Sequence, residues 1–399
     1  MLNSEVPSKV LAYVGAIASD LHNGAFDPKR WYEELEKGFL DYLESLIVLD
    51  FVVITGDFFD TKISMNSDHA TYALKFLTKL LKICEKKNAK CRIIKGTESH
   101  DNKQLEIFKV LYRSTKCDFK VIQTVEDEWL FDDLHVLYIP EEYMSDMNEY
   151  YKEYFAKTYD MIFGHGMINQ VLHIATNQES EVTMSKAPIF KTNELFAICK
   201  GPIFFGHIHK DIVIDNKFYY VNSFSRWSFG EEEDKGFRMC FYSPVTGKYR
   251  VEYIVNKLAR RFDTITVDCG SPDFNKTEKE QIEYLMKLVD TFIIDYLRLE
   301  INIPEDYPNP NLFTKMLNEV FSKFKNIKLK INNNSKLRQK KEIEEKVNIL
   351  LEKYGFIFNK SISYEEKLSR FIKEKYGRNI PVDKIRQYLF EGISAKGEN

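Results

Sequence analysis

Two stretches near the amino terminus decide the fold: KVLAYVGAIASDLH (residues 9–22) and DFVVITGDFFD (residues 50–60). Each is an apolar run of strand length that ends in acidic or histidine side chains. Amphipathic patterns at about 29–48 and 66–88 predict helices between the first strands. Further buried strands are predicted for CRIIKG (91–96), LHVLYIP (134–140), DMIFGH (160–165) and PIFFGH (202–207). Strands separated by helical crossovers indicate an α/β layered fold.

Histidine and aspartate residues gather where these strands end. Five of the eight histidines lie in such clusters, within SDLH, GDFFD, GTESHD, FGHG and FGHIH. In open α/β sheets the carboxyl ends of the strands form the edge where loops converge and ligands bind. One such motif alone is weak evidence, because a single histidine in an apolar strand is more often a core residue. Five motifs at five strand ends predict one shared site.

The residue types in these clusters predict a pair of divalent cations. Asp20 and His22, like His207 and His209, are two residues apart, so their side chains lie on the same side of an extended segment. Asp57 lies between the two pairs in the sequence and is the expected bridge. Mixed imidazole and carboxylate ligands suit Mn²⁺, Fe²⁺ or Zn²⁺ better than Ca²⁺. Paired ions of this kind activate water and stabilise phosphoryl oxygens, so the predicted chemistry is phosphoester hydrolysis.

The rest of the chain predicts two further parts. Residues 1–257 are predicted to form the first domain, and a strand–helix–strand–helix–strand pattern over 258–332 predicts a small α/β domain. The segment NNNSK (332–336) marks a polar break. Beyond it, residues 333–399 predict a helical tail with helices near 337–354, 363–376 and 382–393.

Charge and composition limit the function classes. The net charge is −3, which at first argues against a nucleic-acid partner. The charge is uneven, however: residues 1–255 carry 30 basic and 38 acidic side chains, and residues 256–399 carry 27 and 22. Cations bound by the acidic side chains of residues 1–255 would supply positive charge there, so the net charge does not exclude a nucleic-acid partner. No apolar run is long enough to span a membrane, and six scattered cysteines predict a reducing cytoplasm, or a host cytoplasm for a viral protein.

On these motifs the chain resembles the calcineurin-like metallophosphoesterases, which carry DxH, GDxxD, a glycine-to-HD element, GH and GHxH in this order. The stretch YYVNSFSRWSFGEEEDKGF (219–237) is similar to the element after GHxH in the nuclease subunit of SbcCD-type DNA repair complexes. The resemblance implies a metallophosphoesterase β-sandwich flanked by helices, with a DNA-capping domain and ATPase-binding helices behind it.

The resemblance also implies residue roles. His100 would be the catalytic histidine and Asp60 would orient it, and the two metal ions would be held by Asp20, His22, Asp57, His165, His207 and His209. The family usually has an Asn metal ligand directly before the catalytic histidine, and this chain has GTESHD (96–101) instead. Alignment on His100 nominates Ser99, alignment on Gly96 nominates Thr97, and Glu98 is chemically the strongest ligand. Mn²⁺ is the expected ion, with Mg²⁺, Fe²⁺ and Zn²⁺ as alternatives.

The expected function is that of a two-metal DNA nuclease, an exonuclease on duplex ends and an endonuclease on single strands, in DNA repair and recombination. The expected partners are DNA, an SbcC-like coiled-coil ATPase and a second copy of the chain. A basic segment predicts DNA contacts by Lys336, Arg338, Lys340 and Lys341. The alternatives are a protein phosphatase or cyclic-nucleotide phosphodiesterase, since fold does not fix substrate, or a non-catalytic DNA-end-binding scaffold.

Overall fold

The computed structural model describes residues 12–171, 188–271, 277–291, 295–324, 326–334, 347–359 and 361–387. The chain divides into two compact units, Met1–Phe262 and Asp263–Asn399. The first unit extends past the predicted boundary at residue 257. Arg260 explains the extension, because its backbone N–H donates to Ser225 Oγ at 3.0 Å and its guanidinium lies 3.8 Å from the centre of the Trp227 ring.

Two six-stranded mixed sheets form the centre of the first unit in the described part of the chain. The first has the order β14 (Tyr249–Val255), β13 (Gly236–Tyr242), β1 (Tyr13–Ala18), β2 (Phe51–Thr55), β3 (Lys90–Ile94) and β4 (Phe119–Ile122). The second has the order β11 (Ile212–Ile214), β12 (Phe218–Tyr220), β10 (Ile203–Gly206), β7 (Met161–His165), β6 (Leu134–Ile139) and β5 (Glu126–Phe131). Strands β1 to β4 are parallel to one another, as are β6, β7, β10 and β12.

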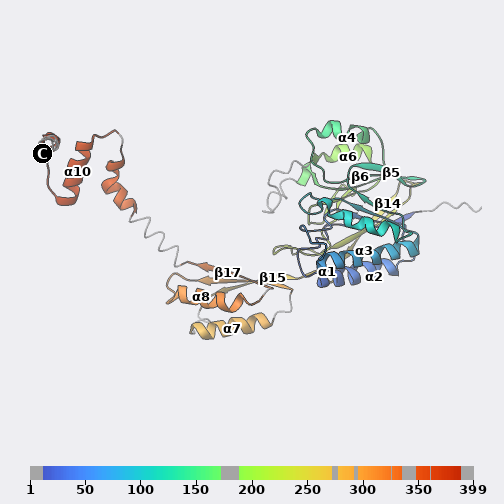
Figure 1. Cartoon of the computed structure of the whole chain (residues 1–399), viewed down its shortest axis with the longest axis horizontal. Helices are drawn as coiled ribbons and strands as arrows, with labels where there is room; N and C mark the ends of the chain where they lie inside the picture. The colour runs from blue at the N-terminus through green and yellow to red at the C-terminus, as the bar shows by residue number, and fades with distance from the viewer. Residues whose placement is uncertain are drawn as a thin grey trace, which may run out of the picture. The chain divides into compact units, whose positions relative to one another are not determined.

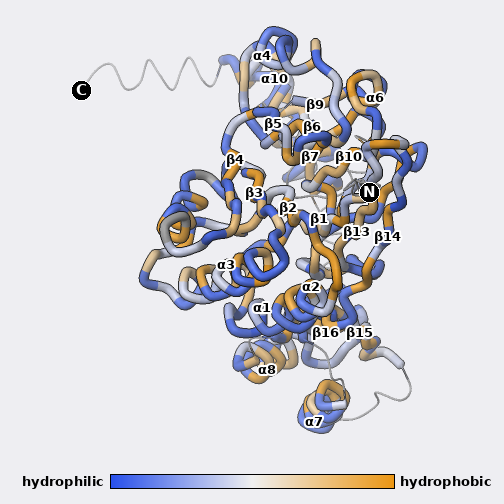
Figure 2. The backbone as a smooth tube through the Cα atoms, turned by 90° about the vertical axis from the view of Figure 1, so that its right-hand side faces the viewer, coloured by the Kyte–Doolittle hydropathy of each residue, from blue (hydrophilic) through white to orange (hydrophobic). Residues whose placement is uncertain are grey.

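The two sheets pack face to face over a shared apolar core, which explains why so many of their residues are apolar. Phe51 and Val53 of the first sheet belong to the same buried cluster as Phe163 and Phe204 of the second. In Figure 2 several of these strands, including β1 and β10, are coloured hydrophobic over much of their length. Strands buried on both faces need near-continuous apolar sequence, as β2 shows with FVVIT fully buried.

Helices cover the outer faces of both sheets, with α1, α2 and α3 on one side of the sandwich and α4 and α6 on the other (Figure 1). The helices and turns of this unit are α1 (Pro28–Leu35), the π-helical turn η1 (Glu36–Leu40), α2 (Asp41–Ser45), α3 (Asp68–Lys87), the 3-10 helices η2 (Asn102–Arg113) and η3 (Asn169–Val171), α4 (Met147–Phe155) and α6 (Thr192–Ile198). A short two-stranded pair, β8 (Met167–Ile168) and β9 (Ile189–Phe190), lies beside them.

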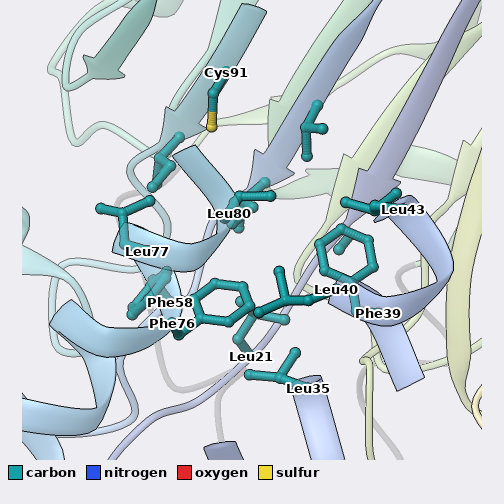
Figure 3. Close-up of a cluster of buried hydrophobic side chains, with 14 of the residues drawn as sticks. Leu21, Leu35, Phe39, Leu40, Leu43, Phe58, Phe76, Leu77, Leu80 and Cys91 are labelled. Carbon is teal, nitrogen blue, oxygen red and sulfur yellow. The ribbon is translucent and has the colours of Figure 1, made fainter. Parts of the chain in front are cut away.

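Helix α3 illustrates why these segments are helical. Ser67 caps its amino end by accepting from the Ala70 N–H, and Asn88 ends it in the left-handed conformation. Apolar side chains three or four residues apart, among them Phe76, Leu77 and Leu80, form one buried face. Figure 3 shows these three side chains meeting Phe39 and Leu40 of η1 in a continuous apolar cluster beneath the first sheet.

The second unit contains a three-stranded sheet with the order β15 (Phe262–Asp268), β16 (Tyr296–Ile303) and β17 (Ile327–Asn333). Helices α7 (Glu278–Asp290) and α8 (Pro310–Phe321) bury Leu285, Phe313 and Leu317 in its core. Helical residues 347–354, the 3-10 turn η5 (Gly355–Phe358) and α10 (Tyr364–Tyr376) follow. The predicted α/β fold, with mixed sheets flanked by helices, is confirmed. No helix in the described ranges is long and apolar enough to cross a membrane.

Candidate metal centre

The predicted site residues come together where the parallel strands of both sheets end. Asp20 and His22 follow β1, Asp57 and Asp60 follow β2, and the 96–101 loop with His100 follows β3. From the second sheet, His165 ends β7, and His207 and His209 follow β10. Three groups of potential metal-binding side chains result, each with ligand atoms within 4.8 Å of one another: Asp20, His22 and His209; Asp57, His165 and His207; His22, Asp60 and His100.

The backbone at the site is held in an unusual conformation. Asp20, His22, Asp57 and His207 all have positive φ angles, at 51°, 44°, 48° and 95°. Such angles are uncommon for residues other than glycine and cost about 1–3 kcal/mol each when the surrounding structure enforces them. Four in one site indicate that the chain turns sharply after its strands to direct these side chains inward.

The first group combines residues from both sheets. His22 Nε2 lies 3.0 Å from His209 Nε2, and Asp20 Oδ1 lies 3.4 Å from the same His209 nitrogen. The Asp20 carboxylate also accepts from the backbone N–H of His207 at 3.2 Å. Lys235 fixes the backbone of His209, because its buried ammonium donates to the His209 carbonyl at 2.7 Å. Lys235 belongs to the 219–237 stretch, which thus reaches the site.

The second group is arranged around Asp57. His165 donates from Nδ1 to the Thr55 carbonyl at 2.8 Å, which leaves Nε2 facing Asp57 Oδ2 at 3.2 Å. The other Asp57 oxygen accepts from the Thr97 N–H at 2.6 Å. His207 Nδ1 is buried and has no hydrogen-bond partner among the described residues. His165, whose Nδ1–H is bonded to a carbonyl and whose Nε2 faces a carboxylate, therefore has the tautomer of a metal-binding histidine.

The charges of the two groups also suit a cation. Burial alone would raise the pKa of Asp20, but the hydrogen bond and charge of His209 lower it to about 2. For Asp57, too, burial opposes ionisation, yet the charges of His165, His100 and His22 hold its pKa well below the ordinary value. Both carboxylates are therefore ionised inside the protein, where backbone N–H donors and nearby positive charge stabilise them. A divalent ion can supply that charge in place of the histidine protons, and this donor set fits Mn²⁺, Fe²⁺ or Zn²⁺.

His100 and Asp60 lie beside the first group. The His100 ring is buried, and its centre is 5.0 Å from that of His22. Asp60 Oδ1 lies 3.2 Å from His22 Nδ1. The structure therefore brings together all the predicted histidine and aspartate residues of the site.

Among the three alternatives in the GTESHD loop, Thr97 is the residue that lies within the second group. Its hydroxyl is buried, 3.3 Å from Asp57 Oδ2 and 3.5 Å from His165 Nε2. Ser99, which the alignment on His100 nominated, is exposed. Glu98 forms an ion pair with Lys95 at 3.2 Å and is partly exposed.

Two further buried carboxylates lie in this region: Asp101, which belongs to the predicted GTESHD cluster but was given no role, and Glu141, which the sequence did not single out. Asp101 accepts from the N–H groups of Phe59 and Gly96 at 3.0 and 2.7 Å, and so joins the loops after β2 and β3. Burial, and then the charge of Asp57, raises the pKa of Asp101 to about 7. Glu141 lies 3.3 Å from His207 Nδ1. It is the second residue after the end of β6, as Asp20 and Asp57 are after β1 and β2, and this shared position is the signal that could have found it.

The predicted DNA-contacting residues Lys336, Arg338, Lys340 and Lys341 lie outside the described residues.

No family model and no curated protein matches this chain. Several solved structures match; one of them, a crystal structure, has a TM-score of 0.34 and 11% sequence identity, and the match covers 61% of this chain and 99% of the other.

Proposed function

We propose that this chain is a metal-dependent phosphodiesterase that cleaves DNA. The observation that carries the proposal is the convergence of two adjacent groups of histidine and carboxylate ligands, with His100 buried next to the first. Such pairs of sites are typical of enzymes that hydrolyse phosphate esters.

Each group contributes residues with distinct tasks. Asp20, His22 and His209 would hold one divalent ion, and Asp57, His165 and His207 the other. When bound, the two ions would activate a water molecule and stabilise negative charge on the phosphoryl oxygens. The fixed Nδ1 of His165 and the Asp57 oxygen held by Thr97 orient these ligands before any ion arrives, which reduces the cost of binding.

His100 is proposed as the residue that meets the scissile phosphate. An imidazole at this position can donate a proton to the departing oxygen or a hydrogen bond to a phosphoryl oxygen. Its contact with the His22 ring places it against the first group.

The proposal of DNA as substrate is supported by the resemblance of the motifs and of residues 219–237 to the SbcCD-type nuclease subunit, and by the basic rear of the chain. The scaffold alternative loses its main support, because Thr97 lies within the second group where GTESHD departs from the family pattern.

A coiled-coil ATPase partner and a second copy of the chain belong to the same proposal. The tail supports a partner of this kind, since Ile349, Leu350 and Leu351 are each at least half exposed in the second unit, and Phe358 is 76% exposed. Apolar side chains at this density on a helix are typical of a surface that another helix covers.

The test of the function is an assay with Mn²⁺ and three labelled substrates: duplex DNA, single-stranded DNA and a small phosphodiester. Cleavage of DNA that exceeds cleavage of the small ester is expected. Cleavage of the small ester alone would favour another phosphoesterase, and DNA binding without cleavage in any divalent metal would favour the scaffold.

Replacing His100 should separate its role from metal binding. For His100→Gln we expect a loss of cleavage of at least about 100-fold, because proton transfer contributes roughly 10²–10⁴ to such rates. Metal content should stay unchanged. The control is His135→Gln, since His135 bonds to Asp127 at 2.8 Å on β5 and β6. Loss of metal in the His100 variant would instead make His100 a ligand.

A further inference from the structure

Glu141 is a buried carboxylate that faces the second group of ligands. Its side chain is 1% exposed, and it follows β6 in the second sheet. Its Oε2 atom lies 3.3 Å from His207 Nδ1, 3.9 Å from His165 Nε2 and 3.3 Å from Thr97 Oγ1. A buried carboxylate without positive charge nearby is strongly unfavourable, so its position calls for a cationic partner.

The contacts of Glu141 fix which oxygen faces the site. Tyr143 donates from its hydroxyl to Oε1 at 3.1 Å, and Oε2 is the atom directed at the two histidines. His207 Nδ1 is buried and has no hydrogen-bond partner among the described residues, while Glu141 Oε2 lies 3.3 Å from it. An imidazole nitrogen and a carboxylate oxygen are both ligand atoms for divalent ions such as Mn²⁺, and at this separation they can bind the same ion.

We propose that Glu141 is a fourth ligand of the second ion, with Asp57, His165 and His207. The inference rests on the metal-binding part of the proposed function. Ligand atoms around an octahedral ion with bonds of about 2.1 Å lie roughly 3 Å apart when adjacent and about 4.2 Å apart when opposite. Three separations fall in this range: 3.2 Å between Asp57 and His165, 3.3 Å between His207 and Glu141, and 3.9 Å between His165 and Glu141.

Glu141 would give the second site a negative charge that Thr97, from the loop after β3, does not supply. From that loop, Thr97 contributes a neutral hydroxyl, whereas Glu141 adds a second negative charge beside Asp57. Anionic oxygen ligands favour hard ions such as Mn²⁺ and Mg²⁺ over softer ones. The Thr97 hydroxyl lies 3.3 Å from both carboxylates and so links them.

The experiment measures metal binding, not activity. Purified full-length chain is dialysed against a series of Mn²⁺ concentrations, and bound metal per chain is determined by mass spectrometry. The variants are Glu141→Gln, which keeps the size of the side chain, and Glu141→Ala. We expect two ions per wild-type chain, and in both variants one ion at unchanged affinity and a second weakened at least about 10-fold.

Two neighbouring glutamates serve as controls. Glu142→Gln should keep both ions, because Glu142 accepts from the Val125 N–H and the Tyr150 hydroxyl, both at 2.8 Å, outside the site. Glu98→Gln should also keep both, since Glu98 pairs with Lys95. Weakening by Glu98→Gln and not by Glu141→Gln would overturn the inference.

The outcomes for the inference and for the proposed function are distinct. Two ions bound with unchanged affinity in Glu141→Gln would refute Glu141 as a ligand and leave the function standing. A wild-type chain that binds no Mn²⁺ would refute both. Circular dichroism on the isosteric Gln variant shows whether the fold is retained, so that lost binding is assigned to the missing charge.

Discussion

Gly56 lies directly after β2, where the backbone comes close to the candidate ligand His165. Its φ angle is 89°, and a Cβ atom at this position would meet His165 Nδ1 at 2.2 Å. Only glycine satisfies both the left-handed backbone and the close approach. The GD motif therefore has a structural reason besides the chemistry of Asp57.

Gly56→Ala should destabilise the protein by more than the backbone strain alone. Gly230 is a matched control, because its φ angle is 98° and a Cβ atom added there would meet nothing within 4 Å. We expect Gly230→Ala to lower the free energy of unfolding in urea by about 1 kcal/mol, and Gly56→Ala to lower it by about 3 kcal/mol or more. Equal losses would show that the contact with His165 is relieved by local movement.

Residues of the site differed in how well the sequence predicted them. Histidines are rare in this chain, so those at strand ends were conspicuous. Glu141 was not, because acidic residues are common and a single carboxylate after a strand has no pattern of its own. Asp101 belongs to the predicted GTESHD cluster, but its role was not predicted. Their roles depend on contacts between segments far apart in the sequence, which spacing cannot reveal.

At the scale of elements, the predicted buried strands and most predicted amphipathic helices are present: the helix predicted over 66–88 is α3 (Asp68–Lys87), and the one predicted over 363–376 is α10 (Tyr364–Tyr376). Strands β1, β2, β3, β6, β7 and β10 lie within or next to the predicted runs, because burial on both faces imposes continuous apolar sequence. The single helix predicted over 29–48 is instead α1, η1 and α2. At the π-helical turn, a Cβ on Gly38 would lie 2.8 Å from Asn256 Oδ1. That long-range contact is not visible in the local pattern.

An ion pair connects strand β5 of the second sheet with β3 of the first. Arg92, which is 3% exposed, donates to Glu128 at 2.7 Å, and the Tyr138 hydroxyl donates to the same Glu128 oxygen at 2.8 Å. Burial works to raise the pKa of Glu128, but the hydrogen bonds and charge of Arg92 outweigh it and lower the pKa below its ordinary value. A lowered pKa means that ionised Glu128 stabilises the folded state.

This linkage predicts how stability depends on pH. The contribution of Glu128 is present above its unfolded pKa and is lost as the pH falls through the lower folded pKa. Glu128→Gln should therefore cost about 1–3 kcal/mol at pH 7, and the difference from wild type should shrink as the pH falls below about 4.5. The free energies of unfolding of both proteins in urea, measured at several pH values, give this difference.

Glu33→Gln is the control for this series, because the Glu33 side chain is 45% exposed and lies 3.8 Å from Lys29. It should leave stability nearly unchanged at every pH. A gap between Glu128→Gln and wild type that stays constant down to acid pH would contradict the role of the charge.

For the whole molecule, the charge distribution predicts how DNA binding responds to salt. Each phosphate contact contributes about 0.9 to the slope of log affinity against log salt concentration. Replacing Lys336, Arg338, Lys340 and Lys341 by Gln should lower this slope by up to about 3.6. The control replaces exposed lysines of the first unit: Lys29, Lys86, Lys152 and Lys200. Equal slopes for both variants and wild type would reject the predicted DNA contact.

The tail predicts a second property of the whole chain. Deleting residues 337–399 removes the exposed Leu350, Leu351 and Phe358, and should abolish co-purification with a coiled-coil ATPase. Mn²⁺-dependent cleavage by the deleted chain should remain, because the candidate ligands all lie in the first unit. Co-purification that survives the deletion would move the docking surface elsewhere.

Each candidate ion site draws its ligands from both sheets: Asp20 and His22 face His209, and Asp57 faces His165 and His207. An ion bound in either group would therefore connect the two sheets, and a chelator could remove that connection. Melting temperature would then report occupancy, since a ligand that binds only the folded state adds about 2.7 kcal/mol at one hundred times its Kd. Chelation would loosen the sandwich where its strands end, while the apolar core between the sheets kept the halves together.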